Sequence, residues 1–253
     1  MTGTSSGKLY IVPTPIGNLE DITLRALRVL REVPTVACED TRVTANLLRH
    51  FEIPHKRLVS YFTGNEASRA GQIIALLHAG EDVALVSDAG TPGISDPGTR
   101  LIASAIAAGI TIVPLPGPTA LVTAVIASGL PTDSLLFEGF LPHKKGRQTA
   151  LKRLQEEDRT IVLYESPHRI VKTLKELAEH LGGDRPASLG RELTKLYEEI
   201  NRGTLAELHA LYAGRASIKG EFVVVVGGRP RTRRERGERE EPGGMSFDPE
   251  EEE

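Results

Sequence analysis

The sequence predicts an α/β fold with a largely parallel sheet, and three observations carry that prediction. Short apolar runs recur along the chain, as in residues 9–12. Segments with apolar side chains at helical spacing separate these runs, as in residues 22–30. Glycine or proline follows several of the runs, as Pro13 does. Strands that alternate with helices in this way are typical of parallel sheets.

The first half of the chain shows this alternation most regularly. Each expected strand is a short run of apolar residues, and each expected helix repeats them every three or four positions. The expected strands are residues 9–12, 35–38, 57–61, 82–87 and 110–113, and the expected helices are residues 22–30, 41–51, 66–79 and 101–108.

A second unit begins near Pro114. Prolines and a glycine in residues 115–120 precede a helix of small residues, and residues 142–148 form a polar, basic connector. Ser166 at the N-cap and Pro167 at the first helical position predict another helix. Strands are expected at residues 160–164 and 221–226, and the apolar stripe of the helix consists of Ile170, Leu174, Leu177 and Leu181.

Charge and composition restrict the classes of function. The last 25 residues hold 6 Arg and 9 acidic residues, so residues 1–228 carry 25 basic and 25 acidic residues and no net charge. A neutral body excludes a protein that coats nucleic acid by bulk charge, but not one with a local basic patch. The chain has no Trp and only 4% aromatic residues, which disfavours a row of stacking rings for single strands.

Cys38 is the only cysteine, so no internal disulfide and no cysteine-based zinc site can form. No apolar leader opens the chain, and residues 121–130 are too few to span a bilayer. We therefore expect a cytoplasmic protein with no membrane partner and no bound metal. The expected organisation is a flexible leader (1–7), an N-terminal domain (8–114), a C-terminal domain (115–228) and a disordered Arg/Glu-rich tail (229–253).

Residues 87–98 form the most informative loop. They follow a buried strand, where parallel α/β sheets bind ligands, and contain three glycines and two aspartates. The glycines let a ligand approach the backbone, and Asp88 can accept hydrogen bonds from it. Asp96 precedes Pro97 and also fits a helix cap.

Other loops leave alternatives open. Residues 13–19 form a rigid turn or a ligand loop, but lack the glycine fingerprint of dinucleotide-binding proteins. Residues 116–120 fit an adenosine-sized pocket or a turn between domains. In residues 39–42, Asp40 fits a helix cap, whereas Glu39 and Arg42 suit a substrate with hydroxyls and phosphates.

Polar motifs in the second half lie at residues 164–169, 191–195 and 219–222. His168 and Arg169 are expected in the first turn of a helix, where a cation opposes the helix dipole. These charges either serve a ligand or lie on a solvated surface.

Together and in order, these motifs resemble the methyltransferase I family of small-subunit ribosomal RNA methyltransferases, which belongs to the tetrapyrrole methylase superfamily. The resemblance covers about residues 8–228. It rests on residues 9–21, 39–42, 86–98, 114–118, 138–142, 164–169, 191–195 and 219–221.

The resemblance implies a homodimer of two-domain chains, each with a cofactor cleft between its two α/β domains. It implies S-adenosylmethionine-dependent methylation of a cytidine ribose 2′-oxygen in the decoding region of 16S RNA, within the small ribosomal subunit. The implied cofactor residues are Ile16, Asp88, Gly90, Thr91, Thr119, Ala120, Tyr164 and Glu221. The implied RNA residues are Arg42, Lys144, Lys145, Arg147, His168 and Arg169.

Methyl transfer to an alcohol requires alignment of the reacting atoms and removal of the hydroxyl proton. Glu39 is our first choice for the base, ahead of Asp40, Asp96, Glu165 and His168. The rival functions are methylation of a corrin-type small molecule by the same fold, a nicotinamide-dependent oxidoreductase, and a non-catalytic ribosome-assembly factor that binds RNA.

Overall fold

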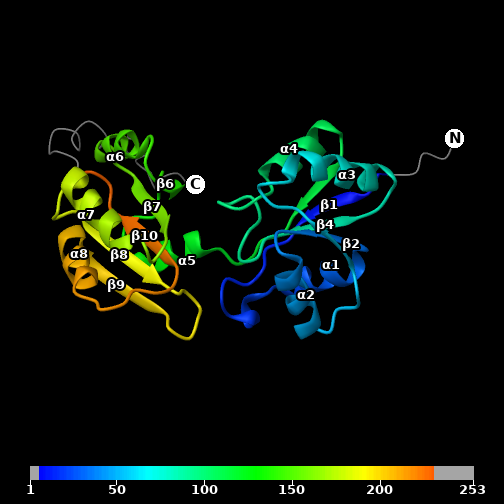
Figure 1. Cartoon of the computed structure of the whole chain (residues 1–253), viewed down its shortest axis with the longest axis horizontal. Helices are drawn as coiled ribbons and strands as arrows, with labels where there is room; N and C mark the ends of the chain where they lie inside the picture. The colour runs from blue at the N-terminus through cyan, green and yellow to red at the C-terminus, as the bar shows by residue number, and fades with distance from the viewer. Residues whose placement is uncertain (1–5, 231–253) are drawn as a thin grey trace, which may run out of the picture.

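Two halves, each built on a five-stranded sheet, make up residues 6–230, the part of the chain that this computed structural model describes (Figure 1). The first sheet contains strands β1–β5 and the second contains β6–β10. The predicted α/β fold is confirmed. Most of the expected leader and nearly all of the expected tail lie outside the described residues.

The first sheet is parallel throughout, as the sequence predicts. Its strand order is β3-β2-β4-β1-β5. Helices α1 and α2 cover one face and α3 and α4 cover the other, so the central strands β2 and β4 are buried at every residue. The strands are β1 (Lys8–Ile11), β2 (Thr35–Cys38), β3 (Arg57–Ser60), β4 (Val83–Val86) and β5 (Thr111–Pro114). The helices are α1 (Leu24–Glu32), α2 (Thr41–His50), α3 (Glu66–His78), α4 (Thr99–Ala107) and the 3-10 turn η1 (Leu19–Asp21).

The second sheet corrects the expectation of a largely parallel arrangement. Its order is β6-β7-β10-β8-β9, and only β6 and β7 are parallel. The strands are β6 (Leu135–Phe140), β7 (Thr160–Glu165), β8 (Pro186–Arg191), β9 (Glu199–Thr204) and β10 (Phe222–Val226). Strands β6, β8 and β9 were not predicted from the sequence, because glycine, proline and polar residues interrupt their apolar pattern.

Helices also cover both faces of the second sheet. The helix α5 packs on one face, and α6, α7 and α8 pack on the other around the largest apolar cluster. The predicted apolar stripe of α7 is confirmed, since all four of its residues are buried. The helices are α5 (Ala120–Ser128), α6 (Arg147–Gln155), α7 (Ile170–Leu181) and α8 (Leu205–Ala213).

Two predicted helix starts are wrong. The helix α7 begins at Ile170 and not after Ser166, because residues 167–169 form a turn in which the Arg169 N–H donates to the Ser166 carbonyl. The helix α4 begins after Gly98, which takes φ 146°, so Asp96 does not cap it. Asp40 does cap α2, as predicted, by accepting the Arg42 N–H at 2.8 Å.

Candidate functional site

A cavity of ≈ 390 Å³ lies where loops of both halves meet. From the first sheet, loops that follow β1, β4 and β5 line it, at the carboxyl ends of parallel strands. From the second, residues of β6, β7 and β10 and the loop after β8 close it. Seven of the eight predicted cofactor residues line this cavity, namely Ile16, Gly90, Thr91, Thr119, Ala120, Tyr164 and Glu221.

Asp88 is the exception among them. Its carboxylate accepts the Asp40 N–H at 3.0 Å, and it is not among the residues that line the cavity. The side chain therefore joins the loop after β4 to the start of α2. In this way Asp88 fixes the polar edge of the site.

Short contacts bind the three loops of the first half together. Thr14 and Gly90 exchange two backbone hydrogen bonds of 2.9 and 3.0 Å, and the Thr91 hydroxyl donates to the Pro118 carbonyl. Gly90 has φ +78°, a conformation that favours glycine. A Cβ at Gly117 would lie 2.7 Å from Pro13 Cβ. The glycines of these loops thus permit close packing of backbone around the cavity.

The two halves also contact each other directly. The Asn18 N–H donates to Thr194 Oγ1 at 3.1 Å. A Cβ at Gly17 would lie 2.4 Å from Lys195 Cγ, so only glycine fits there. The loop at residues 13–19 is therefore part of the contact between the halves as well as of the cavity.

Several residues that line the cavity were not predicted from the sequence. Phe140 and Leu193 supply apolar wall, and Lys195 pairs with Glu192 and with Glu221, at 3.0 and 2.8 Å. For Phe140, the signal was the Glu-Gly-Phe-Leu-Pro segment, where Gly139 marks a shift in the register between β6 and β7. A bulge of this kind re-aims the side chain that follows it.

Carboxyl groups gather at one side of the site. Burial, with the charges of Asp88 and Glu221, raises the pKa of Asp96 to about 6. Burial, with the charge of Asp96, also raises the pKa of Glu39. In contrast, a hydrogen bond from the Arg42 side chain lowers the pKa of Asp40 to about 2. Of Asp96, Glu39 and Asp40, only Asp96 lines the cavity.

The raised pKa of Asp96 predicts a pH-dependent stability. Because the folded pKa of about 6 exceeds the value of about 3.9 expected in the unfolded chain, the folded state holds the proton more tightly. The contribution of this protonated carboxyl group to the free energy of unfolding is complete below pH ~4 and is lost as the pH rises through ~6. Asp96→Asn cannot ionise, so the variant should gain stability over the parent across this window, by at most about 1.4 kcal/mol per pH unit.

Urea unfolding of both proteins from pH 4 to pH 7 measures this difference. Asp133→Asn, at an exposed position before β6, is the control. The difference in the free energy of unfolding between this variant and the parent should not depend on pH. A difference between Asp96→Asn and the parent that does not change with pH would contradict the prediction.

The predicted RNA residues fall into two groups. Arg42, Lys144, Lys145 and His168 are exposed, and the Arg42 side chain keeps 88% of its surface although it pairs with Asp40. The prediction that Arg147 contacts RNA is corrected, because the residue is 4% exposed and its guanidinium is directed into the protein. Arg169 is half-buried, and Glu165 and the Leu141 carbonyl hold its side chain.

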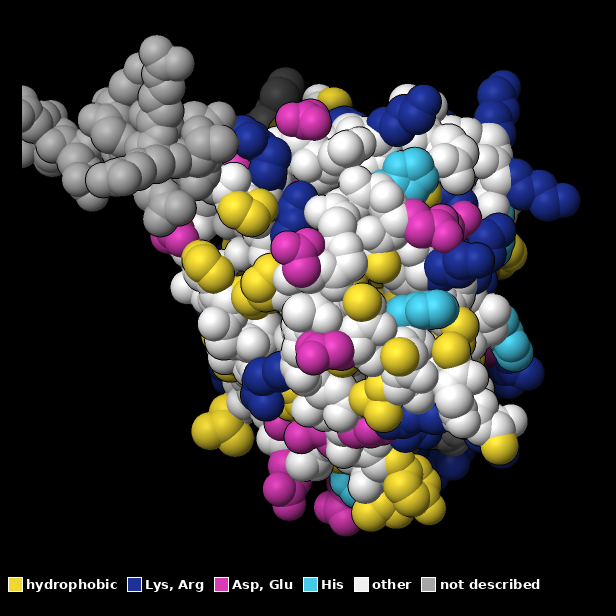
Figure 2. Space-filling model, turned by 90° about the vertical axis from the view of Figure 1, so that its left-hand side faces the viewer, with side chains coloured by type: hydrophobic (Ala, Val, Ile, Leu, Met, Phe, Trp, Pro, Cys, Tyr) yellow, Lys and Arg dark blue, Asp and Glu magenta, His cyan; other side chains and the backbone are white. Residues whose placement is uncertain are grey.

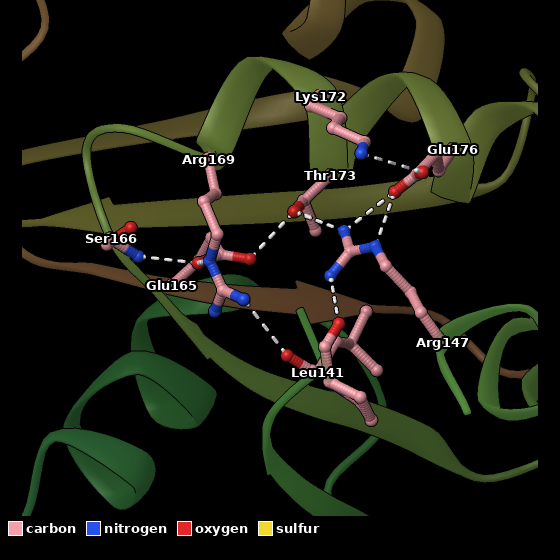
Figure 3. Close-up of polar contacts among 9 residues, drawn as sticks. Leu141, Arg147, Glu165, Ser166, Arg169, Lys172, Thr173 and Glu176 are labelled. Carbon is pink, nitrogen blue, oxygen red and sulfur yellow. Dashed lines mark hydrogen bonds and ion pairs between the residues drawn. The ribbon is translucent and has the colours of Figure 1, made fainter. Parts of the chain in front are cut away.

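Figure 3 shows the network that buries Arg147. Its guanidinium donates to Glu176 at 2.7 Å, to the Thr173 hydroxyl at 2.7 Å and to the Pro142 carbonyl at 3.1 Å. The Thr173 hydroxyl in turn donates to Glu165 at 2.7 Å. The network therefore ties the basic connector to α7 and to the end of β7, beside the cavity.

No cluster of His, Cys, Asp and Glu within residues 6–230 has the arrangement of a metal site. Over the same residues, no helix is both long and apolar enough to cross a membrane.

Comparisons with known proteins agree with this geometry. The family model for tetrapyrrole (corrin/porphyrin) methylases matches residues 8–209. Ribosomal RNA small subunit methyltransferase I of Micromonospora olivasterospora is 54% identical over 226 residues, which cover 89% of this chain and 72% of that protein. The protein of the same name from Pseudomonas aeruginosa is 51% identical, with 88% of this chain and 80% of that protein covered.

Solved structures show the same fold. Uroporphyrin-III-C-methyltransferase from Thermus thermophilus matches with a TM-score of 0.61 and 26% identity, covering 87% of this chain and 94% of that one. A cobalt precorrin-4 methyltransferase matches with a TM-score of 0.63 and 20% identity, over 87% of this chain and 94% of that one. The chain therefore belongs to the tetrapyrrole methylase family and, within it, to the ribosomal RNA small subunit methyltransferase I proteins.

Proposed function

We propose that this chain methylates the ribose 2′-oxygen of a cytidine in the decoding region of 16S ribosomal RNA. The observation that carries the proposal is the identity of about half of all positions, across nearly the whole described body, with proteins named for RNA methylation. In the reaction, the 2′-oxygen forms a bond to the methyl carbon as the sulfur–carbon bond breaks. S-adenosylhomocysteine and a proton are released.

The cavity fits S-adenosylmethionine, which supplies a methyl group activated on a positively charged sulfur. Its volume of ≈ 390 Å³ lies in the usual range for small-molecule sites. Gly90 and Ala120 leave backbone open to a ligand, while Ile16 and Tyr164 offer apolar surface. The lining acids outnumber the single lining cation, Lys195, which suits a cationic ligand.

The contacts of the five candidate bases favour one of them. Asp40 is paired with Arg42, and the Glu165 side chain is fully buried and accepts three hydrogen bonds. Glu39, our first choice from sequence, does not line the cavity, and neither does His168. We therefore assign removal of the 2′-hydroxyl proton to Asp96.

Asp96→Asn should lower the methylation rate about 10²-fold or more, because the variant loses proton removal in the transition state. In the parent, the rate should rise with pH through about 6 as Asp96 ionises. Single-turnover rates from pH 5 to pH 8 test both statements. Glu39→Gln is the comparison: a larger loss in Glu39→Gln than in Asp96→Asn would return the base to Glu39.

The substrate must be held by local positive charge. Figure 2 shows that on the outer end of the second half Lys and Arg side chains are interspersed with Asp and Glu, so this face offers no continuous basic surface. The exposed cations among the predicted RNA residues are the better candidates. We propose that Arg42, Lys144, Lys145 and His168 contact the RNA, together with the half-buried Arg169.

Changing Lys144 and Lys145 together to Ala should weaken binding of small subunits and flatten its salt dependence. Each lost phosphate contact lowers the slope of log K against log salt by roughly 0.7 to 0.9. Filter binding at several salt concentrations measures the slope. Lys172→Ala with Lys175→Ala removes two exposed charges from α7 and is the matched control. An equal slope in both double variants would exclude the connector from the interface.

We also infer two domains, residues 8–114 and 115–228, and a homodimer. The separate sheets support the first inference. Exposed apolar side chains support the homodimer. They are Val122 and Ile126 on α5 and Leu196 and Tyr197 after β8. Light scattering of the protein in solution tests the dimer.

One experiment tests the proposed function. Small subunits from a strain that lacks this methyltransferase are incubated with the chain and labelled S-adenosylmethionine, and the labelled nucleotide is mapped. Label on a cytidine 2′-oxygen in assembled subunits supports the proposal. Binding of subunits without transfer would instead favour the assembly factor. Transfer only to a corrin would favour the small-molecule methylase.

A further inference from the structure

A second cavity, of ≈ 450 Å³, lies between the end of β6 and the helix α6. One wall comes from β6 and the two residues after it, the other from Gly146 and α6. The basic connector joins these walls. The carbonyls of Leu141 and Pro142 accept hydrogen bonds from Arg169 and Arg147, so the buried network holds the connector in place (Figure 3).

Phe140 lines both cavities. Its ring meets the Tyr164 ring edge to face, with centroids 5.8 Å apart. The residue is nevertheless 52% exposed, so part of its ring is open to solvent. A ring that a neighbour holds on one side and that is open on another can stack with a nucleobase.

Polar groups around the second cavity match the rest of a nucleotide. Arg153 and Glu138 form an ion pair across it, and the Arg153 side chain is 65% exposed. Carboxylate and guanidinium groups read the edges of bases, and Arg also binds phosphate. The exposed Lys144 and Lys145 lie on the connector. Gly146, at the start of α6, makes no side-chain cap, so the first amides of the helix add to the positive potential.

We propose that the second cavity binds a nucleotide next to the methylated one, with its base stacked on Phe140 and its phosphate near the connector. This inference rests on the proposed function, because it places the target ribose at the first cavity. Phe140 then separates the target from its neighbour, which favours a single-stranded segment whose bases are splayed apart.

Two substitutions test the subsite, and one of them, at Thr149, lies outside the first cavity. Thr149→Trp fills the second cavity from α6, and the neighbouring exposed Gln148→Trp does not, because Gln148 does not line it. Phe140→Leu removes the stacking ring, and Phe140→Tyr keeps it. Thr149→Trp and Phe140→Leu should raise the KM for small subunits about five- to a hundredfold. Gln148→Trp should stay within twofold of the parent KM, and Phe140→Tyr should stay closer to the parent than Phe140→Leu. Thr149→Trp and Gln148→Trp should keep the parent's affinity for S-adenosylhomocysteine, because neither residue lines the first cavity.

A KM for small subunits that is unchanged in both Thr149→Trp and Phe140→Leu would overturn the subsite while leaving the proposed function intact. If the parent transfers no methyl group, the proposed function fails, and the subsite is tested by binding alone. The probe is then a single-stranded RNA oligonucleotide of decoding-region sequence, followed by fluorescence anisotropy. Weaker binding to Thr149→Trp than to Gln148→Trp supports the subsite, and equal binding overturns it.

Discussion

Arg147→Met is expected to lower the free energy of unfolding by about 3 to 5 kcal/mol. The side chain of Arg147 is 5% exposed, and it donates to Glu176, Thr173 and the Pro142 carbonyl. Methionine fills much of the same volume but donates no hydrogen bond. The loss of stability therefore comes from the Glu176 carboxylate, whose side chain is only 14% exposed. After the substitution, its remaining cationic partner is Lys172, at 3.8 Å. Urea denaturation measures the change.

Arg28→Met is the matched control for this prediction. It makes the same substitution on a helix and also breaks a pair with a glutamate, Glu32. Because the side chains of Arg28 and Glu32 are 59% and 58% exposed, water replaces the lost partner of Glu32, and the expected loss is at most about 1 kcal/mol. Equal losses in the two variants would show that burial of Arg147 adds nothing to stability.

Arg147 also illustrates what could not be predicted from sequence. It follows two lysines and a glycine, a pattern typical of a solvated basic loop. Its partners Thr173 and Glu176 lie 26 and 29 residues further along the chain. Only the packing of α6 against α7 brings them together, and no local pattern records such a contact.

The first sheet was predictable for a physical reason. Its central strands are covered on both faces, so they are continuous apolar runs with clear ends. In the second sheet β9 is an edge strand, and none of its six residues is buried. Its sequence therefore lacks the apolar run from which the other strands were predicted. The antiparallel pairs β10–β8 and β8–β9 involve strands that were not recognised, whereas β7 and β10 were recognised and only their relative direction was missed.

The cavity was largely predictable because glycines and prolines mark the loops of the first half. The positive φ of Gly90 favours glycine, and the Pro13 ring leaves no room for a Cβ at Gly117; such glycines are visible in the sequence. The wall from the second half was less visible. Phe140 and Leu193 are apolar residues like many others, and the fold alone directs them to the cavity.

Ala120→Phe is expected to abolish the stabilisation of this chain by S-adenosylhomocysteine. For the parent, a ligand at a hundred times its Kd adds about 2.7 kcal/mol to the free energy of unfolding, because it binds only the folded state. Ala120 lines the cavity at the first residue of α5. A phenyl ring there fills space that the ligand needs. The Tm of Ala120→Phe should therefore not change when the ligand is added.

Ile106→Phe tests whether the effect is specific to the cavity. Ile106 lies on α4, does not line the cavity and is 61% exposed. Phenylalanine there adds a ring outside the cavity, so the ligand should raise the Tm as it does in the parent. Ligand-induced shifts of equal size in the two variants would place the cofactor outside this cavity. The same result would remove the physical basis for assigning proton removal to Asp96, which lines the cavity with Ala120.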